Sequence, residues 1–381
     1  MSSAEQEAAF HPLTIIELCL SKGRGGLEHY AADLVPALGA RGHRVVVVAE
    51  EDNEFGKRAG QPIALTLPHH RYLRWFGARQ LGKLAREANA DVIHIHRSAD
   101  LPLAVLAKRS AGNRPALVYS RHMLITRDRR TSLAHRYMFR HVDRMLPITE
   151  QIAAVARKEL PIAPERVQAL APGVAPVAGT EDCERIRPPA CDFVVGCFSR
   201  VEPAKGQHQL IEAIAKLREH GVKAGAVFAG SVMNPPYDAA LHRQVKTRQL
   251  DAAVRFLGTL ADARPVMPCC DVVAMPSTGE ALGLVMVEAM LMGVPVVASA
   301  AGGVLEYVRD GETGLTYPVG DVAALAERLE RLARDPAFAH SLARAGREAA
   351  GECFDRDRHL ARLEAIFRDA VAERAADRRK P

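Results

Sequence analysis

The chain has 381 residues, of which 48% are hydrophobic and 25% charged, enough for two folded domains and incompatible with intrinsic disorder. No stretch approaches the ~18 apolar residues of a membrane-spanning helix, and the amino terminus lacks a secretion signal, so we expect a cytoplasmic protein. The seven cysteines show no CxxC spacing and predict reduced thiols. Cys269-Cys270 is open to a redox or metal role, although two small buried side chains explain the pair better.

The net charge of +6 is concentrated in one stretch. Residues 71–144 hold 16 Lys/Arg against 5 Asp/Glu, and the rest of the chain is mildly acidic. Aromatic residues, including Trp75 and Phe76, lie among these basic residues. Basic and aromatic side chains together are typical of a surface that binds an anionic membrane, and burial of the aromatic side chains in the core is the alternative. No nucleic-acid-binding motif is present, so we expect no nucleic-acid partner.

The first half alternates apolar runs with helical patterns. The runs are too continuous for half-exposed strands and predict parallel strands that are covered on both faces. Strands are expected at Leu13–Leu20, Arg44–Ala49, Ile63–Leu67, Asp91–His96, Ala116–Ser120 and Arg144–Thr149, and helices at Gly26–Ala40, Leu73–Ala88 and Thr131–His141.

The Pro- and Gly-rich segment Ala171–Pro189 predicts an interdomain linker, after which the alternation restarts. Two alternating units predict two doubly wound α/β domains whose shared ligand lies beyond the carboxyl ends of the strands. Strands are expected at Phe193–Phe198, Ala224–Ala229, Val254–Leu257, Asp271–Met275 and Val294–Ser299, and helices at Gln207–His220, at Val322–Ala333 with Asp321 as its cap, and at Arg356–Arg378.

Two features follow strands of the first half. The loop SKGRGGLEHY places Gly25 and Gly26 before a helix, where free N–H groups suit a phosphate. The same glycines are open to a dinucleotide fingerprint, although Glu28 stands at its third glycine position, or to a simple tight turn. His122 follows a strand and is expected to face the ligand. For His94 and His96 we favour structural roles over metal binding, because no third ligand is apparent.

The second half carries the stronger pattern. Arg200 and Lys205 follow a strand, where two cations suit a diphosphate, and a solvated basic loop is the alternative. Glu280 and Glu288 flank a helix start, and eight residues of helix separate them by ~12 Å along its axis. That spacing suits a sugar ring and a ribose of one nucleotide sugar. Between them, the segment Ala281, Leu282, Gly283 and Leu284 is expected to offer N–H groups to phosphate.

At these residues the chain resembles the family 4 glycosyltransferases, retaining enzymes of the GT-B fold. The resemblance covers nearly the whole chain and is most specific from Pro276 to Pro318, with the Glu280/Glu288 pair, Gly302-Gly303 and DGETGL. It departs at Leu282, where the family commonly has an aromatic residue, and at Ser199, where it has glycine.

The resemblance implies two Rossmann-like domains facing a cleft, at 1–178 and 190–354, with helix 355–381 crossing back onto the first. Gly25 and Gly26 correspond to the glycine loop near the donor phosphates. His122 corresponds to the histidine at the donor sugar, and Arg200 with Lys205 to the diphosphate clamp. Glu280 is similar to the carboxylate that orients the sugar hydroxyls, and Glu288 to the ribose ligand. Gly258-Thr259 corresponds to the edge that reads the base.

The implied reaction is retaining, metal-independent transfer of a hexose, from a UDP-sugar in preference to a GDP-sugar. The resemblance implies no cofactor, a nucleotide-sugar substrate, and a glycan or lipid-linked acceptor in lipopolysaccharide or other envelope polysaccharide synthesis. The protein is expected in the cytoplasm or at the cytoplasmic face of the inner membrane. An NAD-dependent oxidoreductase is an alternative, but it leaves Lys205 and Glu280 unexplained. A sugar epimerase or phosphorylase of the same fold, and a non-catalytic nucleotide-binding module, are the others.

Overall fold

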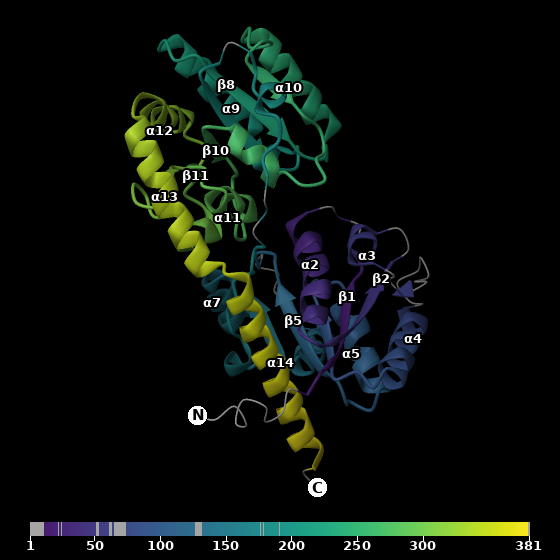
Figure 1. Ribbon diagram of the computed structural model, residues 1–381. Helices are drawn as coiled ribbons and strands as arrows, with labels where there is room; N and C mark the ends of the chain where they lie inside the picture. Colours follow the sequence, from purple (N-terminus) through teal and green to yellow (C-terminus); the bar gives the residue numbers. More distant parts are fainter. Residues whose placement is uncertain are drawn as a thin grey trace. The chain divides into compact units, whose positions relative to one another are not determined.

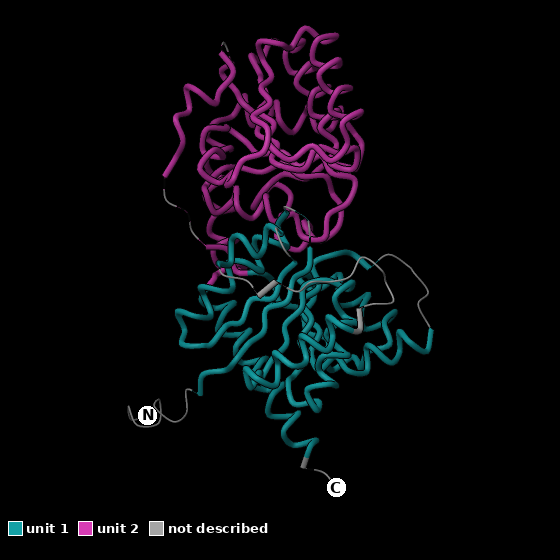
Figure 2. The backbone as a smooth tube through the Cα atoms, turned by 90° about the vertical axis from the view of Figure 1, so that its right-hand side faces the viewer, with its two compact units in different colours: residues 1–172, 357–381 teal, residues 173–356 magenta. Residues whose placement is uncertain are grey.

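The computed structural model describes residues 11–21, 23, 25–50, 53–60, 63–64, 74–125, 132–175, 177, 179–189 and 191–379 (Figure 1). Within these residues, no helix is both long and apolar enough to cross a bilayer. The chain forms two compact units, one of residues 1–172 with 357–381 and one of residues 173–356 (Figure 2). The first unit is therefore built from both ends of the chain, and each unit is described by itself below.

Unit 1 is a parallel six-stranded sheet with helices between consecutive strands. The strands lie in the order β3-β2-β1-β4-β5-β6. Its elements are β1 (Thr14–Cys19), α2 (Gly26–Ala40), β2 (Arg44–Ala49), α3 (Glu54–Ala59), β3 (Ile63–Ala64), α4 (Arg74–Glu87), β4 (Val92–Ile95), α5 (Leu101–Ser110), β5 (Ala116–Arg121), α6 (Leu133–Arg140), β6 (Arg144–Pro147), α7 (Glu150–Glu159), the short 3-10 helix η2 (Pro164–Arg166) and the last helix α14 (Arg356–Arg379).

Unit 2 repeats this architecture, with strand order β12-β11-β10-β7-β8-β9. Numbered from its own first strand, it has the same 3-2-1-4-5-6 order as unit 1, which is the order of dinucleotide-binding folds. Its elements are α8 (Cys183–Ile186), β7 (Phe193–Phe198), η3 (Pro203–Lys205), α9 (Gln207–Glu219), β8 (Ala224–Ala229), α10 (Pro235–Thr247), β9 (Val254–Phe256), η4 (Arg264–Cys269), β10 (Val272–Met275), α11 (Leu284–Leu291), β11 (Val296–Ser299), η5 (Gly302–Glu306), β12 (Leu315–Tyr317), α12 (Val322–Arg334) and α13 (Pro336–Cys353).

The predicted doubly wound α/β fold is confirmed, with small shifts at element ends. Strand β3 is described only at Ile63–Ala64, and the rest of the predicted run lies outside the described residues. The short edge strand β12 was not predicted, because its three residues follow the turn-rich segment 310–314. Asp321 caps α12 as predicted, its carboxylate accepting the Ala324 N–H at 2.9 Å.

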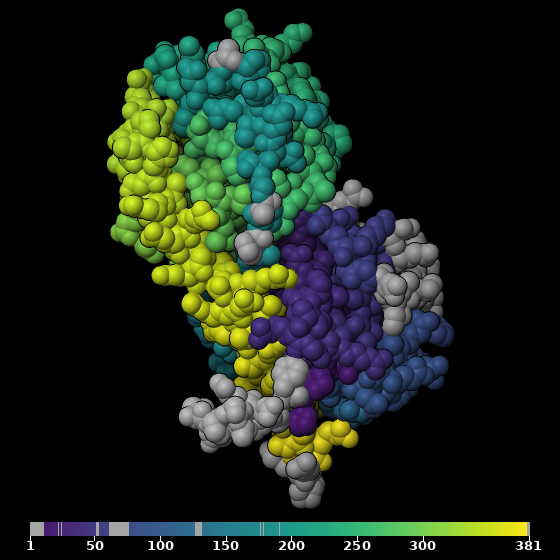
Figure 3. Space-filling view, in the orientation of Figure 1, coloured from purple at the N-terminus to yellow at the C-terminus, as the bar shows by residue number. Residues whose placement is uncertain are grey.

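The last helix, α14, completes the core of unit 1. Its apolar side chains Leu363 and Phe367 are fully buried against a cluster that includes Leu34 and Leu38 of α2. Beside them, Glu364 accepts two hydrogen bonds from the Arg41 guanidinium, at 2.7 and 3.0 Å. Figure 3 shows the yellow surface of α14 meeting the purple surface of the amino-terminal elements. The end of the chain thus covers residues from its beginning.

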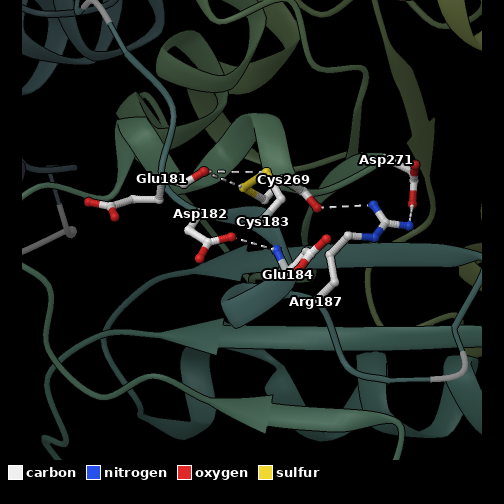
Figure 4. Close-up of a disulfide and its surroundings, with 7 residues drawn as sticks. All are labelled: Glu181, Asp182, Cys183, Glu184, Arg187, Cys269 and Asp271. Carbon is white, nitrogen blue, oxygen red and sulfur yellow. Dashed lines mark hydrogen bonds and ion pairs between the residues drawn. A yellow bond between two sulfur atoms is a disulfide. The ribbon is translucent and has the colours of Figure 1, made fainter.

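A disulfide joins Cys183 of α8 to Cys269 of η4, within unit 2 (Figure 4). The expectation of reduced thiols is therefore wrong for this pair. The two cysteines are 86 residues apart, so no local spacing reveals them, yet the fold brings their Cα atoms to 5.0 Å. Arg187 fixes the same corner by donating to the Cys269 carbonyl at 3.1 Å and to Asp271 at 2.8 Å. Cys270 is a buried free thiol, and burial raises its pKa to about 12.

Replacing Cys183 with Ser is expected to lower the free energy of unfolding of unit 2 by about 2–4 kcal/mol, because the crosslink closes a long loop in the unfolded chain. Urea denaturation of the oxidised protein measures this, and dithiothreitol should reproduce the loss in the wild type. Cys353→Ser, at an exposed free cysteine, is the matched control and should change nothing. Equal stability of all three oxidised proteins would contradict the disulfide.

Candidate functional site

The predicted basic residues lie where the strand order of unit 2 reverses. Arg200 and Lys205 follow β7, and Glu280 follows β10, which pairs directly with β7. The connections that leave these two parallel strands run in opposite directions across the sheet. In doubly wound sheets, a crevice outside the carboxyl ends of the strands is expected at such a point. Ligands of doubly wound sheets bind at this kind of crevice, so the three predicted residues lie in the expected place.

Lys205 and Glu280 meet in a direct ion pair. The Lys205 ammonium donates to Glu280 Oε1, and the Ser277 hydroxyl donates to the same oxygen at 2.9 Å. Both charged side chains are mostly buried, at 15% and 16% exposure. Among the described residues, none donates to Glu280 Oε2. Arg200 is more exposed and pairs with Glu202 at 2.9 Å. Neither predicted cation is therefore an isolated charge; each has a carboxylate beside it.

The loop after β10, residues 276–283, is held by close main-chain contacts on two sides. A Cβ on Gly206 would lie 1.9 Å from the Pro276 carbonyl oxygen, and one on Gly302 would lie 1.8 Å from that of Glu280. Both glycines also have positive φ, at 68° and 69°, so any other residue there is strained as well as crowded. Gly303 donates its N–H to the Glu280 carbonyl at 3.1 Å. The main chain of Glu280 is thereby fixed before any ligand arrives.

Helix α11 begins at Leu284, so the expected eight residues of helix between Glu280 and Glu288 are not formed, because the chain is helical only from Leu284 onward. Gly283 takes positive φ (77°) as its N-cap, and no side chain caps this end. The Tyr307 hydroxyl lies within donor distance of two carbonyl oxygens just before the helix, those of Leu282 and Gly283, at 2.8 and 3.0 Å. Ala281 is half-buried, as is Glu288 in the second turn of the helix. The amino end of α11 thus points main-chain N–H groups beyond the same strand edge as Lys205.

Gly258 and Thr259 follow β9, next to the end of β8. The Gly230 N–H donates to the Gly258 carbonyl at 2.8 Å, and the Thr259 hydroxyl donates to Ser231 Oγ at 3.3 Å. Gly258 has positive φ (69°) and open space around its Cα. These residues form a second stretch of the carboxyl edge of the unit 2 sheet.

Unit 1 carries a buried polar cluster between β1 and β4, the two strands at which its strand order reverses. Glu17 on β1 bonds His94 Nδ1 and His96 Nε2, both at 2.8 Å. His94 Nε2 reaches the Ser120 hydroxyl at 2.8 Å. Our expectation that no third ligand lies near the two histidines is wrong, because Glu17 completes a set that could hold a metal ion. In this structure the set is instead joined by direct hydrogen bonds between its members.

His122 extends this cluster toward the surface. Its Nε2 lies 3.4 Å from His96 Nδ1, and the Tyr30 ring packs on it with a centroid distance of 5.0 Å. The Tyr30 hydroxyl is bonded to His359 Nε2 of α14 at 2.9 Å, and His359 Nδ1 donates to the Ala171 carbonyl at 2.7 Å. Only 8% of His122 is exposed. Burial lowers the pKa of His122 well below its usual value.

The glycine loop of unit 1 differs from the amino end of α11. The Gly25 N–H, predicted to be open to a phosphate, donates to Glu28 Oε2 at 2.9 Å. The Ser21 hydroxyl donates to the other oxygen of Glu28, which is buried. Gly26 is the first residue of α2, so this carboxylate caps the helix where an anion would otherwise bind. Glu28, which stands at the third glycine position of a dinucleotide fingerprint, is thus the residue whose side chain bonds the N-cap of α2.

The basic and aromatic region is only partly described. Residues 71–73 and 126–131 lie outside the described residues, as do the side chains of Arg74 and Trp75. Phe76 is 60% exposed, whereas Phe139 of α6 is buried in the core. Burial therefore explains one of these aromatic residues and does not explain the other.

Two family models match the chain, "Glycosyltransferase Family 4" over residues 24–177 and "Glycosyl transferases group 1" over residues 181–349. A GDP-mannose-dependent alpha-(1-6)-phosphatidylinositol monomannoside mannosyltransferase of Mycolicibacterium smegmatis is 31% identical over 374 residues, covering 85% of this chain and 90% of that protein. The chain belongs to glycosyltransferase family 4.

Two further relatives of this family 4 glycosyltransferase were found. The crystal structure of Anabaena HepE in complex with UDP and glucose matches with a TM-score of 0.80 at 25% identity, over 94% of this chain and 100% of HepE. The lipopolysaccharide core biosynthesis glycosyltransferase LpsE of Rhizobium meliloti is 33% identical over 176 residues, 46% of this chain and 50% of LpsE. The predicted family and GT-B fold are confirmed, and the oxidoreductase alternative is excluded.

Several residues of the two candidate sites were not predicted from the sequence. Ser277 and Tyr307 hold the Glu280 loop, and Glu17 and His359 complete the cluster behind His122. A detectable signal existed only for Glu17, a single charge within the apolar run TIIELC, where burial demands a polar partner. His359 lies in a charged helix pattern and gave no such signal.

The stability of unit 1 is expected to fall as pH drops below about 6.5. Burial lowers the pKa of His359 to about 4, so between pH 6.5 and 4 the unfolded chain binds a proton that the folded chain does not. His359 alone should cost roughly 2 kcal/mol between pH 7.5 and 5. Urea denaturation at these pH values should show a flatter dependence for His359→Gln. His340→Gln, at an exposed histidine, is the control, and equal slopes for all three proteins would disprove the assignment.

Proposed function

We propose that this family 4 enzyme is a retaining, metal-independent hexosyltransferase that uses a UDP-sugar in preference to a GDP-sugar. Its acceptor is a glycan or a lipid-linked saccharide of lipopolysaccharide or another envelope polysaccharide. The donor preference is supported by HepE, whose crystal structure holds UDP and glucose, although the mycobacterial relative is GDP-mannose-dependent. LpsE supports the class of acceptor. We place the enzyme at the cytoplasmic face of the inner membrane, with the exposed Phe76 and the basic 71–144 region toward anionic lipid.

The observation that carries the proposal is the Lys205–Glu280 pair beside the uncapped amino end of α11. An ammonium group and a helix amino terminus both stabilise a diphosphate. No donor among the described residues contacts Glu280 Oε2, and an oxygen of this kind suits the hydroxyl groups of a sugar. One site thus offers groups of opposite charge to the two parts of a nucleotide sugar.

The chemistry follows from these charges. Cleavage of the anomeric C–O bond gives the sugar oxocarbenium character and leaves negative charge on the departing diphosphate. Lys205, Arg200 and the N–H groups of Ala281–Leu284 would stabilise that charge, as a divalent cation does in other transferases. Lys205 has three N–H bonds, so it can keep Glu280 and still reach a phosphate oxygen. The acceptor hydroxyl then attacks the face that the diphosphate leaves, with a phosphate oxygen taking its proton, and the configuration is retained.

The remaining predicted residues take the other parts of the donor. Glu288 would bind the ribose, and Gly258 and Thr259 would contact the base with their main chain. His122 would meet the donor sugar. Gly25 and Gly26 are proposed near the phosphates only through close main-chain approach, because the Gly25 N–H already serves Glu28.

Lys205→Ala is expected to lower kcat/KM for the donor by roughly 100-fold or more, since it removes a group that stabilises charge in the transition state. Released nucleotide measures turnover. Lys223→Ala removes an exposed lysine of the same unit, 69% exposed, and should leave turnover unchanged. Turnover of Lys205→Ala close to that of the wild type would overturn the proposed role of the pair.

A panel of UDP- and GDP-sugars tests the function itself. Thermal stabilisation by UDP, with release of UDP in the presence of an acceptor, supports the proposal. Stabilisation by GDP alone would overturn the donor preference. Water and inorganic phosphate as sole acceptors test an epimerase or phosphorylase of the same fold, which would release free or phosphorylated sugar without any saccharide acceptor.

A further inference from the structure

We propose that Glu17 is a positioning residue that determines, through His96, which ring nitrogen of His122 carries the proton. This inference rests on the proposed function, in which His122 meets the donor sugar, and it deepens that function by assigning the chemical character of His122. Through this chain of contacts, Nδ1 of His122 presents a lone pair, so it accepts a hydrogen bond from a sugar hydroxyl and donates none.

The strand register places the members of the chain side by side. Glu17 of β1 is directly opposite His94 of β4, and His94 is directly opposite Val118 of β5. His96 lies two residues after His94 and therefore on the same face of the sheet. Ser120 and His122 are two and four residues after Val118, so they too lie on that face. Parallel pairing alone brings one carboxylate, three imidazoles and a hydroxyl into a row.

The hydrogen bonds in this row have one direction that is consistent with neutral His96 and His122 rings. Glu17 is wholly buried, and each of its two oxygens lies 2.8 Å from one imidazole nitrogen, of His94 and of His96. The carboxylate is then an acceptor at both oxygens, so His96 Nε2, at 2.8 Å, must carry a hydrogen. His96 is itself almost wholly buried, and burial in a protein interior favours the neutral form of an imidazole.

A neutral His96 with its hydrogen on Nε2 has a lone pair on Nδ1. That lone pair faces His122 Nε2 at 3.4 Å, so His122 donates from Nε2. Its ring is neutral as well, and its own Nδ1 is left unprotonated. The conclusion for His96 is the same whether His94 is neutral or charged, because each histidine has its own oxygen of Glu17.

The groups around His122 do not compete for this nitrogen. The Tyr30 ring packs against the His122 ring at an interplanar angle of 57°, and its hydroxyl is engaged by His359. Among the described residues, His122 makes no hydrogen bond other than that to His96. A lone pair there favours a ligand hydroxyl and repels a carbonyl or carboxylate oxygen, so the tautomer also selects what the sugar presents.

Long-range 1H–15N correlation spectra of protein labelled with 15N-histidine test the tautomers directly. At pH 7.5, His96 and His122 should both carry hydrogen on Nε2 only, assigned with the variants His96→Asn and His122→Asn. Observation of hydrogen on His122 Nδ1 in the wild type would overturn the proposal without any variant. Zn²⁺ is added as a second probe: saturable shifts of the His94 and His96 signals would identify a metal site instead and overturn it too.

Glu17→Gln supplies the second test. An amide donates a hydrogen bond from its nitrogen, so it can change which ring nitrogen of His96 carries the hydrogen. In a folded variant, His122 should lose its single tautomer, and kcat/KM for the donor should fall about tenfold. Ser120→Ala is the control, since it removes the hydroxyl that contacts His94 and Tyr30 but keeps the contacts from Glu17 through His96 to His122, and it should leave the His122 tautomer and kcat/KM unchanged. An unchanged tautomer in Glu17→Gln, or a changed tautomer with unchanged kcat/KM, would overturn the role of Glu17. Failure of the proposed function would appear separately, as a wild type that transfers no sugar but keeps these spectra.

Discussion

Every strand pair in both sheets is parallel, and this constraint decides where the chemistry of the protein collects. Parallel strands end at one edge, so residues far apart in the sequence become neighbours wherever two strands do. The two units have the same strand order, so each sheet has one equivalent point where the order reverses. This point lies between β1 and β4 in unit 1 and between β7 and β10 in unit 2, where the connections after the strands run in opposite directions. The Glu17 cluster occupies that position in unit 1, and the Lys205–Glu280 pair occupies it in unit 2.

The two units place charge at this position in different ways. In unit 1 the charge of Glu17 is fully buried and is held by two imidazoles, a rigid arrangement that persists without a ligand. In unit 2 a lysine and a glutamate partly face solvent and hold each other, while glycines at 206 and 302 fix the main chain around them. The ion pair can rearrange when a diphosphate binds. The desolvation of its two charged groups is only partly offset by the single hydrogen bond from Ser277 to Glu280. The first arrangement suits a fixed orientation, and the second suits charge that develops during a reaction.

The alternation of strands and helices and the family could both be predicted from the sequence, because the continuous apolar runs and the segment after Pro276 carry strong local patterns. The side chains that contact the predicted residues could not be predicted in the same way. Glu17 looks like a stray charge in an apolar strand until the register sets it opposite His94. Cys183 finds Cys269 only through the packing of α8 on η4. In the sequence, Glu28 only stands where a dinucleotide fingerprint would have its third glycine, whereas in the structure its side chain accepts the Gly25 N–H at the start of α2. Each of these depends on tertiary neighbours, which no window of sequence contains.

The way α14 completes unit 1 has a consequence for the order of synthesis. Leu363 and Phe367 belong to the same core as Leu34 and Leu38, but the ribosome adds them more than 300 residues later. At roughly 5–20 residues per second, the amino-terminal strands and helices wait tens of seconds for that helix, and unit 2 is produced in full meanwhile. During the wait, the surface that α14 will cover is exposed on the nascent chain. Truncation or a bulky fusion at the carboxyl terminus should therefore harm the half of the protein that is translated first.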